Sequence, residues 1–197
     1  IGILPGSRTQ EIDYILPEVL GAADLIADKY KKVQFLLPLA STIDESHVQS
    51  YLKLHPEINV KIVRDKAYDV MSVADVCIVT SGTATLETAI IGTPMVVVYR
   101  TNIITSILTK YFIESKHIAL PNVIADKRIV PELIRDEFRA DFIAREVSAI
   151  LDDPDKQKRI RQGLNEVKNT LGEPGAGNRV AEHIANRLKE FNASNEQ

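Results

Sequence analysis

The sequence has neither the paired cysteines typical of secreted proteins nor the long apolar runs typical of membrane-spanning ones. It contains one cysteine, Cys77, which excludes an internal disulfide and leads us to expect a reducing compartment. The apolar neighbours of this cysteine in DVCIVT predict a buried core thiol rather than a nucleophile. No run reaches the roughly 18–20 apolar residues of a membrane span, and we expect no signal peptide.

The net charge is small, and the histidines are few and scattered. The net charge of −3 offers no broad positive surface for a nucleic acid. The four histidines lie far apart, without metal-ligand spacing, and no Ser-His-Asp pattern, dinucleotide fingerprint or Walker loop occurs. The run DDPD at 152–155 resembles a metal-binding motif, but Asp153 followed by Pro154 is typical of a helix cap. We therefore expect neither a metal nor a cofactor.

What remains is an alternation of apolar strands and helical patterns. Strands that are apolar throughout are typical of a parallel sheet with helices on both faces. The strand candidates are 1–4, 33–39, 58–63, 75–80, 95–100 and 118–123, and the helix candidates between them are 10–30, 45–54, 67–74, 83–91 and 102–115. Pro17 predicts a kink or a break in the first helix. The pattern thus predicts an α/β fold with a doubly wound, Rossmann-like sheet.

The C-terminal part is predicted to be helical from residue 130, beginning with PELIRDEF. The segment GEPGAG at 172–177 predicts a loop before the last helix. We expect one domain over 1–171 and a helical C-terminal extension over 172–197, which packs on this domain, on another part of the protein or on a second subunit. Because the chain opens on strand-like IGIL without a methionine, we also expect it to begin inside a longer protein.

The loop after the first strand reads PGSR. Ser7 as N-cap and Gln10 three residues later fit a capping box. That pattern explains neither Gly6, which permits close approach of the backbone, nor Arg8, whose charge the helix dipole opposes. An anion at the helix N-terminus would remove this conflict. The pattern alone leaves the simple cap and the anion site both open.

The loop after the fourth strand is more informative. In TSGTATLE, small residues leave the N-terminus of the next helix open to a ligand. Glu87 lies one position too late for a capping box with Thr83. It is either a carboxylate favoured by the helix dipole or the acceptor for both hydroxyls of a ribose. Two helix ends suited to phosphate, together with this carboxylate, indicate a nucleoside diphosphate.

Two further strand-end loops carry weaker signals. Asn122 in LPNVIA is either a turn-stabilising residue or a donor and acceptor for a ligand. The backbone at Val63 and Arg64 ends a strand where it can read a planar base. The basic pair Lys127 and Arg128 is typical of a solvated turn.

Taken in order, these motifs resemble those of a bacterial enzyme family. LPGSRxxEI, SGTATLE followed by GTPMVVVYR, and LPNVIA followed by a basic turn and VPELI are similar to lipid-A-disaccharide synthases over residues 1 to about 135. The resemblance implies a GT-B glycosyltransferase with two Rossmann-like domains, of which this chain is the C-terminal, nucleotide-binding half. SGTATLE alone would indicate only the wider superfamily of nucleotide-sugar enzymes.

The resemblance also implies an activity and partners. The family transfers 2,3-diacylglucosamine from its UDP carrier to 2,3-diacylglucosamine 1-phosphate (lipid X), with inversion, and forms the β-1,6-linked lipid A disaccharide. Such an enzyme works in the cytoplasm as a peripheral protein at the inner membrane, and a homo-oligomer is compatible with it. Ile12, Tyr14, Ile15 and residues 104–113 either contribute to a membrane surface or face the core, which is the commoner arrangement for such helices.

The resemblance assigns roles to the strand-end residues. It places Arg8 against the leaving diphosphate, the ribose at Glu87, uracil at the backbone of 63–64, and the general base and acceptor site in the other domain. The implied donor-site residues are Gly6, Ser7, Arg8, Val63, Arg64, Ser81, Gly82, Thr83, Ala84, Thr85, Glu87 and Asn122. The alternatives are a UDP-N-acetylglucosamine 2-epimerase, a peptidoglycan glycosyltransferase, or a nucleotide-binding module without catalysis.

Overall fold

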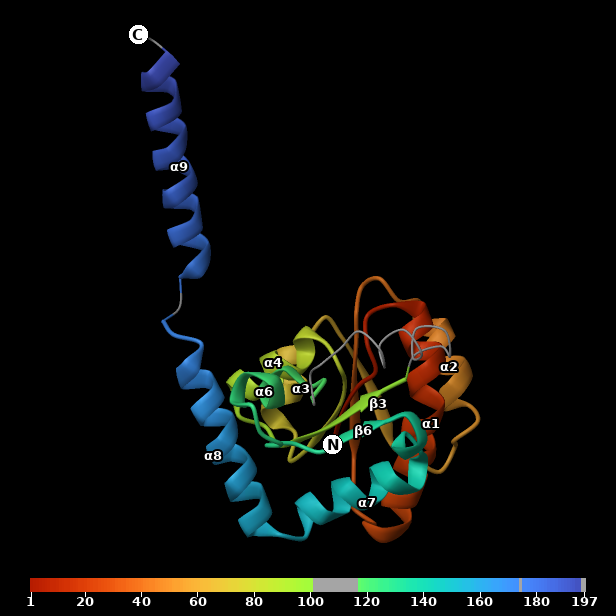
Figure 1. The fold of residues 1–197 in the computed structure, drawn as a ribbon. Coiled ribbons are helices and arrows are strands. Elements are labelled where there is room, and N and C mark those ends of the chain that lie inside the picture. Colours follow the sequence, from red (N-terminus) through yellow and green to blue (C-terminus); the bar gives the residue numbers. More distant parts are fainter. Residues whose placement is uncertain (101–116, 174, 196–197) are drawn as a thin grey trace.

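A six-stranded sheet, parallel throughout, forms the centre of the computed structural model, which describes residues 1–100, 117–173 and 175–195 (Figure 1). The strands lie in the order β3-β2-β1-β4-β5-β6. Their bounds are β1 Gly2–Leu4, β2 Phe35–Leu39, β3 Val60–Arg64, β4 Cys77–Thr80, β5 Met95–Tyr99 and β6 Glu132–Ile134. The strand order reverses between β1 and β4, so the loops after these two strands diverge at a topological switch point.

Helices cover both faces of this sheet, as the doubly wound prediction requires (Figure 1). One layer holds α1 (Thr9–Lys29), α2 (Glu45–Leu52) and α7 (Ala140–Leu151), and α1 packs along α7. The other holds α3 (Ala67–Val73), α4 (Thr83–Ile91), α6 (Leu120–Ala125) and α8 (Pro154–Thr170). The predicted α/β fold class is confirmed.

The core lies between the sheet and these two layers. The apolar side of α1 is buried over more than four turns, from Ile12 to Ile26, and β4 and β5 are almost wholly buried. Such burial supplies most of the stability of a helix whose propensity alone is marginal. Cys77 is fully buried here, and desolvation raises the pKa of its thiol to about 12. The sulfur is therefore protonated and unreactive, as the sequence predicted.

Pro17 does not break α1, so of the two predicted outcomes the break is wrong, and the kink stays a prediction. The helix runs without interruption from Thr9 to Lys29. Pro17 and Asp13, whose carbonyl loses its helical partner at a proline, both lie on the exposed side of the helix. A carbonyl on this side of the helix is open to solvent, so the helix can continue past the proline.

The region from 118 to 137 differs most from the prediction. The strand expected at 118–123 is the short helix α6, with Pro121 in its first turn, where proline is favoured. The sixth strand, β6, lies instead in PELIRDEF, which was expected to be helical and which continues as a 3-10 helix at Arg135–Glu137. β6 has three residues at the edge of the sheet, too few for a periodic pattern. The helix predicted at 102–115 lies outside the described residues.

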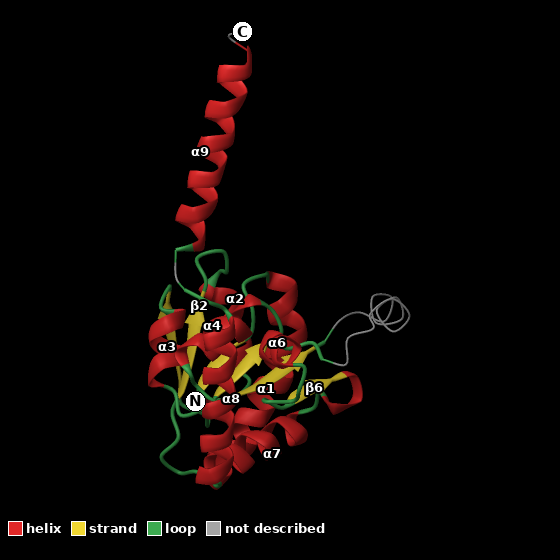
Figure 2. Cartoon of the chain, turned by 60° about the vertical axis from the view of Figure 1, so that its left-hand side comes forward, coloured by secondary structure: helices red, strands yellow, loops and turns green. Residues whose placement is uncertain are grey.

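The C-terminal helix α9 (Ala176–Asn195) projects away from the domain in both views (Figures 1 and 2). Residues 171–175 separate it from α8, so the predicted loop at 172–177 ends two residues earlier, and Ala176 and Gly177 already belong to α9. The side chains of residues 176–188 are exposed, including an apolar row formed by Val180, Ile184 and Leu188. The proposed division at 171/172 follows this change from packed to exposed helix, and it stays a prediction.

Candidate functional site

A cavity of about 550 Å³ opens at the carboxyl ends of the strands, next to the switch point. Loops that follow four neighbouring strands, β1 to β4, line it. The lining residues predicted from the sequence are Gly6, Ser7, Arg8, Ser81, Gly82, Thr83, Ala84 and Glu87. The structure therefore brings together two motifs that lie more than 70 residues apart in the chain.

The first loop ends in a helix cap that differs from the prediction. α1 begins at Thr9 with Arg8 as its N-cap, so the capping box of Ser7 with Gln10 is wrong by one residue. In the observed cap the carboxylate comes from Glu11, whose Oε2 accepts hydrogen bonds from the N–H groups of Ser7 (2.8 Å) and Arg8 (3.3 Å). Glu11 also lines the cavity, and it is a residue that the sequence analysis missed. Its signal was present: a Glu three residues after the true N-cap.

Arg8 is held beside the cavity by the same carboxylate. Its Nη1 donates to Glu11 Oε1 at 2.9 Å, and 81% of its side chain is exposed. An exposed pair of this kind contributes little to stability, about 0–1 kcal/mol. The cation at the start of α1 is thus balanced by a carboxylate of the same helix.

The second loop leaves its helix end open. α4 begins at Thr83 after Gly82, and among the described residues no side chain caps it. Thr85 does not face the cavity: it is fully buried, and its hydroxyl donates to the carbonyl of Gly82 at 2.7 Å. α4 ends at Ile91, and the residue that caps it, Gly92, has a φ of +89°, the left-handed conformation that glycine adopts without strain. The first-turn N–H groups of Thr83 and Ala84 thus have no side-chain partner among the described residues, an arrangement that suits an anion.

Glu87 lies one turn further along α4 and faces the same cavity. Its Oε1 accepts a hydrogen bond from the hydroxyl of Tyr68 at 3.2 Å, and this bond raises the pKa of the phenol. Tyr68 stands at the start of α3 with 61% of the residue exposed. An exposed aromatic ring beside a carboxylate is a surface on which a base or a ribose can rest.

The loop after β3 lines the cavity with residues that follow the two predicted ones in the sequence. Neither Val63 nor Arg64 lines the cavity, and the Arg64 guanidinium pairs with Glu45 at 2.7 Å. The lining residues from this loop are Asp65 to Tyr68, and Asp65 has a φ of +51° that turns the chain away from the strand. The two strand residues are fixed by sheet pairing with β2, so the turn after them carries the exposed groups.

Asn122 is not brought to the cavity. It is fully buried, and its Nδ2 donates to the carbonyl of Val130 (2.9 Å) and to Glu132 Oε1 (2.7 Å). Its Oδ1 accepts from the N–H groups of Ile129 (2.7 Å) and Val130 (3.0 Å). These four bonds use the hydrogen-bonding capacity of the amide. The expectation that Asn122 faces the donor pocket is therefore corrected: it stabilises the turn between α6 and β6.

The hydrogen bonds around Asn122 and Glu132 also extend to the loop that follows β4. Glu132, 8% exposed, accepts from the N–H groups of Ile118 and Ala119 at 3.0–3.3 Å. The carbonyl of Ile118 in turn accepts from Ser81 Oγ at 3.0 Å. Ser81 therefore connects the open helix end to a buried polar cluster that no sequence motif indicated.

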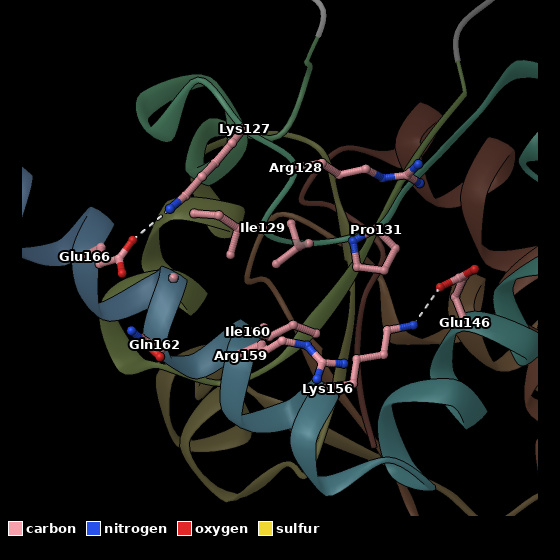
Figure 3. A pocket seen from close by; sticks show the side chains of 12 residues that line it. Lys127, Arg128, Ile129, Pro131, Glu146, Lys156, Arg159, Ile160, Gln162 and Glu166 are labelled. Atoms are coloured by element: carbon pink, nitrogen blue, oxygen red, sulfur yellow. Dashed lines mark hydrogen bonds and ion pairs between the residues drawn. The ribbon is translucent and has the colours of Figure 1, made fainter.

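A second cavity, of about 610 Å³, lies at the amino end of β6, away from the strand ends that form the first (Figure 3). Lys127 and Arg128 line it, and both are exposed, as a solvated turn predicts. Lys127 reaches Glu166 at 2.8 Å, and Lys156 reaches Glu146 at 3.1 Å. Both lysines of this cavity are thus paired with carboxylates.

The acidic run at 152–155 is a helix cap, as predicted. Asp153 Oδ1 accepts from the N–H of Lys156 at 2.9 Å, and Pro154 stands first in α8. In the described part of the chain, no three His, Cys, Asp or Glu residues gather as a metal site. No helix of that part is long and apolar enough to cross a membrane. Ile12 and Ile15 face the core, whereas Tyr14 is 46% exposed.

Comparison with known proteins agrees with the motifs. The family model described as lipid-A-disaccharide synthetase matches residues 1–185. A lipid-A-disaccharide synthase from Geobacter metallireducens is 42% identical over 181 residues, which are 92% of this chain and 47% of that protein. One from Syntrophus aciditrophicus is 39% identical over the same shares. The chain thus spans about half the length of the curated relatives it matches.

Solved structures agree on the fold. A putative UDP-N-acetylglucosamine 2-epimerase from Listeria monocytogenes superposes with a TM-score of 0.65 at 12% identity, over 96% of this chain and 45% of that one. At this identity the likeness shows the GT-B type of fold alone, and it does not favour the epimerase alternative. The family model and the identity to curated relatives carry the assignment. The chain belongs to the lipid-A-disaccharide synthetase family.

Proposed function

We propose that this chain is the donor-binding half of an inverting glycosyltransferase of lipid A biosynthesis. The reaction transfers 2,3-diacylglucosamine from UDP to lipid X and forms a β-1,6-linked disaccharide and UDP. One observation carries the proposal. A single cavity joins two phosphate-ready helix ends, the cation of Arg8 and the carboxylate of Glu87. That set suits a nucleoside diphosphate, because the N–H groups and Arg8 meet its charge while Glu87 accepts from neutral ribose hydroxyls.

In this account the chain stabilises the leaving group. When the glycosidic bond to UDP breaks, negative charge develops on the diphosphate. The first-turn N–H groups of Thr83 and Ala84 are fixed by the helix and meet that charge as preorganised donors, and Arg8 adds its cation to them. Glu87 and Tyr68 orient the nucleoside, and the turn at 65–68 takes over the base contact first assigned to Val63 and Arg64.

The rest of the reaction belongs to groups outside this cavity. The attacking hydroxyl of lipid X needs a general base, which we place, with the acceptor site, in the part of the relatives that this chain does not span. Acylated substrates support work at the cytoplasmic face of the inner membrane as a peripheral protein. The exposed apolar row of α9 supports a further packing partner, either the rest of the enzyme or a second subunit.

Calorimetric titration of the chain with UDP, UMP and ADP tests the proposal. We expect UDP to bind more tightly than UMP, because the second phosphate meets Arg8, and more tightly than ADP. Arg8→Ala and Glu87→Ala should each weaken UDP binding. Arg139→Ala is the matched control, since Arg139 is an exposed arginine paired with Asp141 at the start of α7. UDP binding that ignores both site substitutions would refute the assignment of the cavity.

A further inference from the structure

The donors that the first loop offers to a phosphate already serve a carboxylate of the same chain. Glu11 Oε2 accepts from the N–H groups of Ser7 (2.8 Å) and Arg8 (3.3 Å), and Oε1 accepts from Arg8 Nη1 (2.9 Å). These are the groups that a diphosphate would need at this helix end. The α4 end of the cavity has no such side-chain partner in the described residues.

Gly6 makes room for this arrangement. Its φ of +114° is a conformation that side chains disfavour, and a Cβ on this residue would lie 2.3 Å from Glu11 Oε2. The carboxylate therefore rests directly against the loop backbone, in the space where a bound phosphate would lie. Glu11 is a residue of the cavity wall, with 30% of its side chain exposed, so it can turn outward without unpacking the core.

A carboxylate and a phosphate cannot share these donors fully. Each N–H forms one strong hydrogen bond, and two anions within reach of the same cation repel each other. Binding of a diphosphate at this loop therefore requires Glu11 to leave at least part of its position. The bonds that Glu11 loses reduce the affinity that the loop would otherwise give to the nucleotide.

We propose that Glu11 is an internal competitor for the donor diphosphate. In the empty site it holds the first loop in its binding conformation, and it yields the donors of Ser7 and Arg8 when the nucleotide arrives. When it returns, it displaces the phosphates and so favours release of the product nucleotide. The inference rests on the proposed function, which places a diphosphate in this cavity.

Glu11→Gln tests the competition with little change in shape. A glutamine still offers a carbonyl oxygen to the N–H of Ser7, but it lacks the charge. We expect the variant to bind UDP and inorganic pyrophosphate about tenfold more tightly than wild type by calorimetry, since charge-assisted hydrogen bonds are roughly twice as strong as neutral ones. Asp28→Asn removes one exposed charge near the other end of α1 and should leave both affinities within about twofold of wild type, because surface charges so far away are screened.

The two ligands separate this inference from the function on which it rests. If wild type binds no UDP but Glu11→Gln gains affinity for pyrophosphate, the competitor stands and the nucleotide function falls. The inference is overturned if Glu11→Gln binds both anions as wild type does, or more weakly, and still shows the cooperative thermal unfolding of a folded protein. Glu11 is then only a helix cap. Should Glu11→Gln not fold, Glu11→Asp, one methylene too short to reach Ser7, is expected to tighten binding in the same direction.

Discussion

Two helix ends face the same cavity, yet they are satisfied in opposite ways. The start of α1 carries a cation and is filled by the carboxylate of Glu11, whereas the start of α4 carries neither a charge nor a side-chain cap in the described residues. The difference shows that the N–H groups at the start of a helix can already be bonded to a carboxylate of the same chain. It also predicts unequal roles. The N–H groups at the start of α4 can bind a phosphate without displacing a side chain. Those at the start of α1 have the cation of Arg8 beside them, but Glu11 must leave before a phosphate can bind.

The largest effect on UDP affinity should come from a carboxylate placed at the uncapped start of α4. Thr83→Asp places a carboxylate in the first turn of α4, where the helix dipole favours it, so the melting temperature should not fall. The same charge, about 5 Å from a diphosphate, should weaken UDP binding by roughly 100-fold at an effective dielectric constant near 20. Thr83→Asn, without the charge, is the matched control. Near-wild-type affinity in Thr83→Asp would show that the phosphates do not use this end.

Glu87 sharpens the comparison, because it distinguishes nucleoside recognition from phosphate recognition at α4. Glu87→Gln replaces charge-assisted hydrogen bonds to the ribose by neutral ones and should weaken UDP binding by about tenfold. Affinity for 2′-deoxy-UDP, which offers one hydroxyl less, should change less. Equal losses for both nucleotides, measured by calorimetry, would remove Glu87 from the ribose.

A substitution of Arg8 that retains the positive charge tests the start of α1, where Glu11 occupies the donors. Arg8→Lys keeps the cation but loses the planar fork that serves Glu11 and a phosphate, and we expect UDP affinity to drop by about fivefold. The loss should be larger in the Glu11→Gln background, because Arg8 there gives up no ion pair with Glu11 when it meets the phosphate, and the two effects are therefore not additive. Strictly additive losses in the double-variant cycle would argue against coupling.

The smallest effect on binding should follow substitution of Asn122, despite a large effect on stability. Asn122→Ala leaves the N–H groups of Ile129 and Val130 without their side-chain acceptor and removes one of the donors to the buried carboxylate of Glu132. We expect a loss of about 2–4 kcal/mol in the free energy of unfolding in urea. UDP affinity, measured well below the melting temperature, should stay within about threefold of wild type. Loss of UDP binding by a folded variant would return Asn122 to the donor pocket.

The sequence was sufficient for the fold where burial sets the pattern. β4 and β5 are apolar runs because helices cover both faces of the sheet, and α1 shows a clean helical period, so both were predicted within about two residues. It failed where three residues form an edge strand and where Pro121 begins a helix in an apolar segment. There the conformation depends on Glu132 and its contacts to Ile118 and Ala119, which are distant in sequence.

The site divides in the same way. Small residues before a helix mark an open N-terminus in any context, so Gly82 and Thr83 were found from the pattern. Glu11 was missed because the cap was placed one residue early, and Tyr68 because an exposed aromatic in a short helix has no distinguishing pattern. Asn122 was misplaced because a buried amide and a ligand-binding amide occur in the same kind of motif. Only the three-dimensional contacts separate these cases.

The central claim is that one diphosphate binds both helix ends. Amide NMR of the nitrogen-labelled chain during a UDP titration tests it most directly. We predict that the signals of Ser7 and Arg8 from the first loop, and of Thr83 and Ala84 from the second, shift along one common binding curve. Shifts confined to a single helix end, or centred on residues 127–166 of the second cavity, would contradict the account.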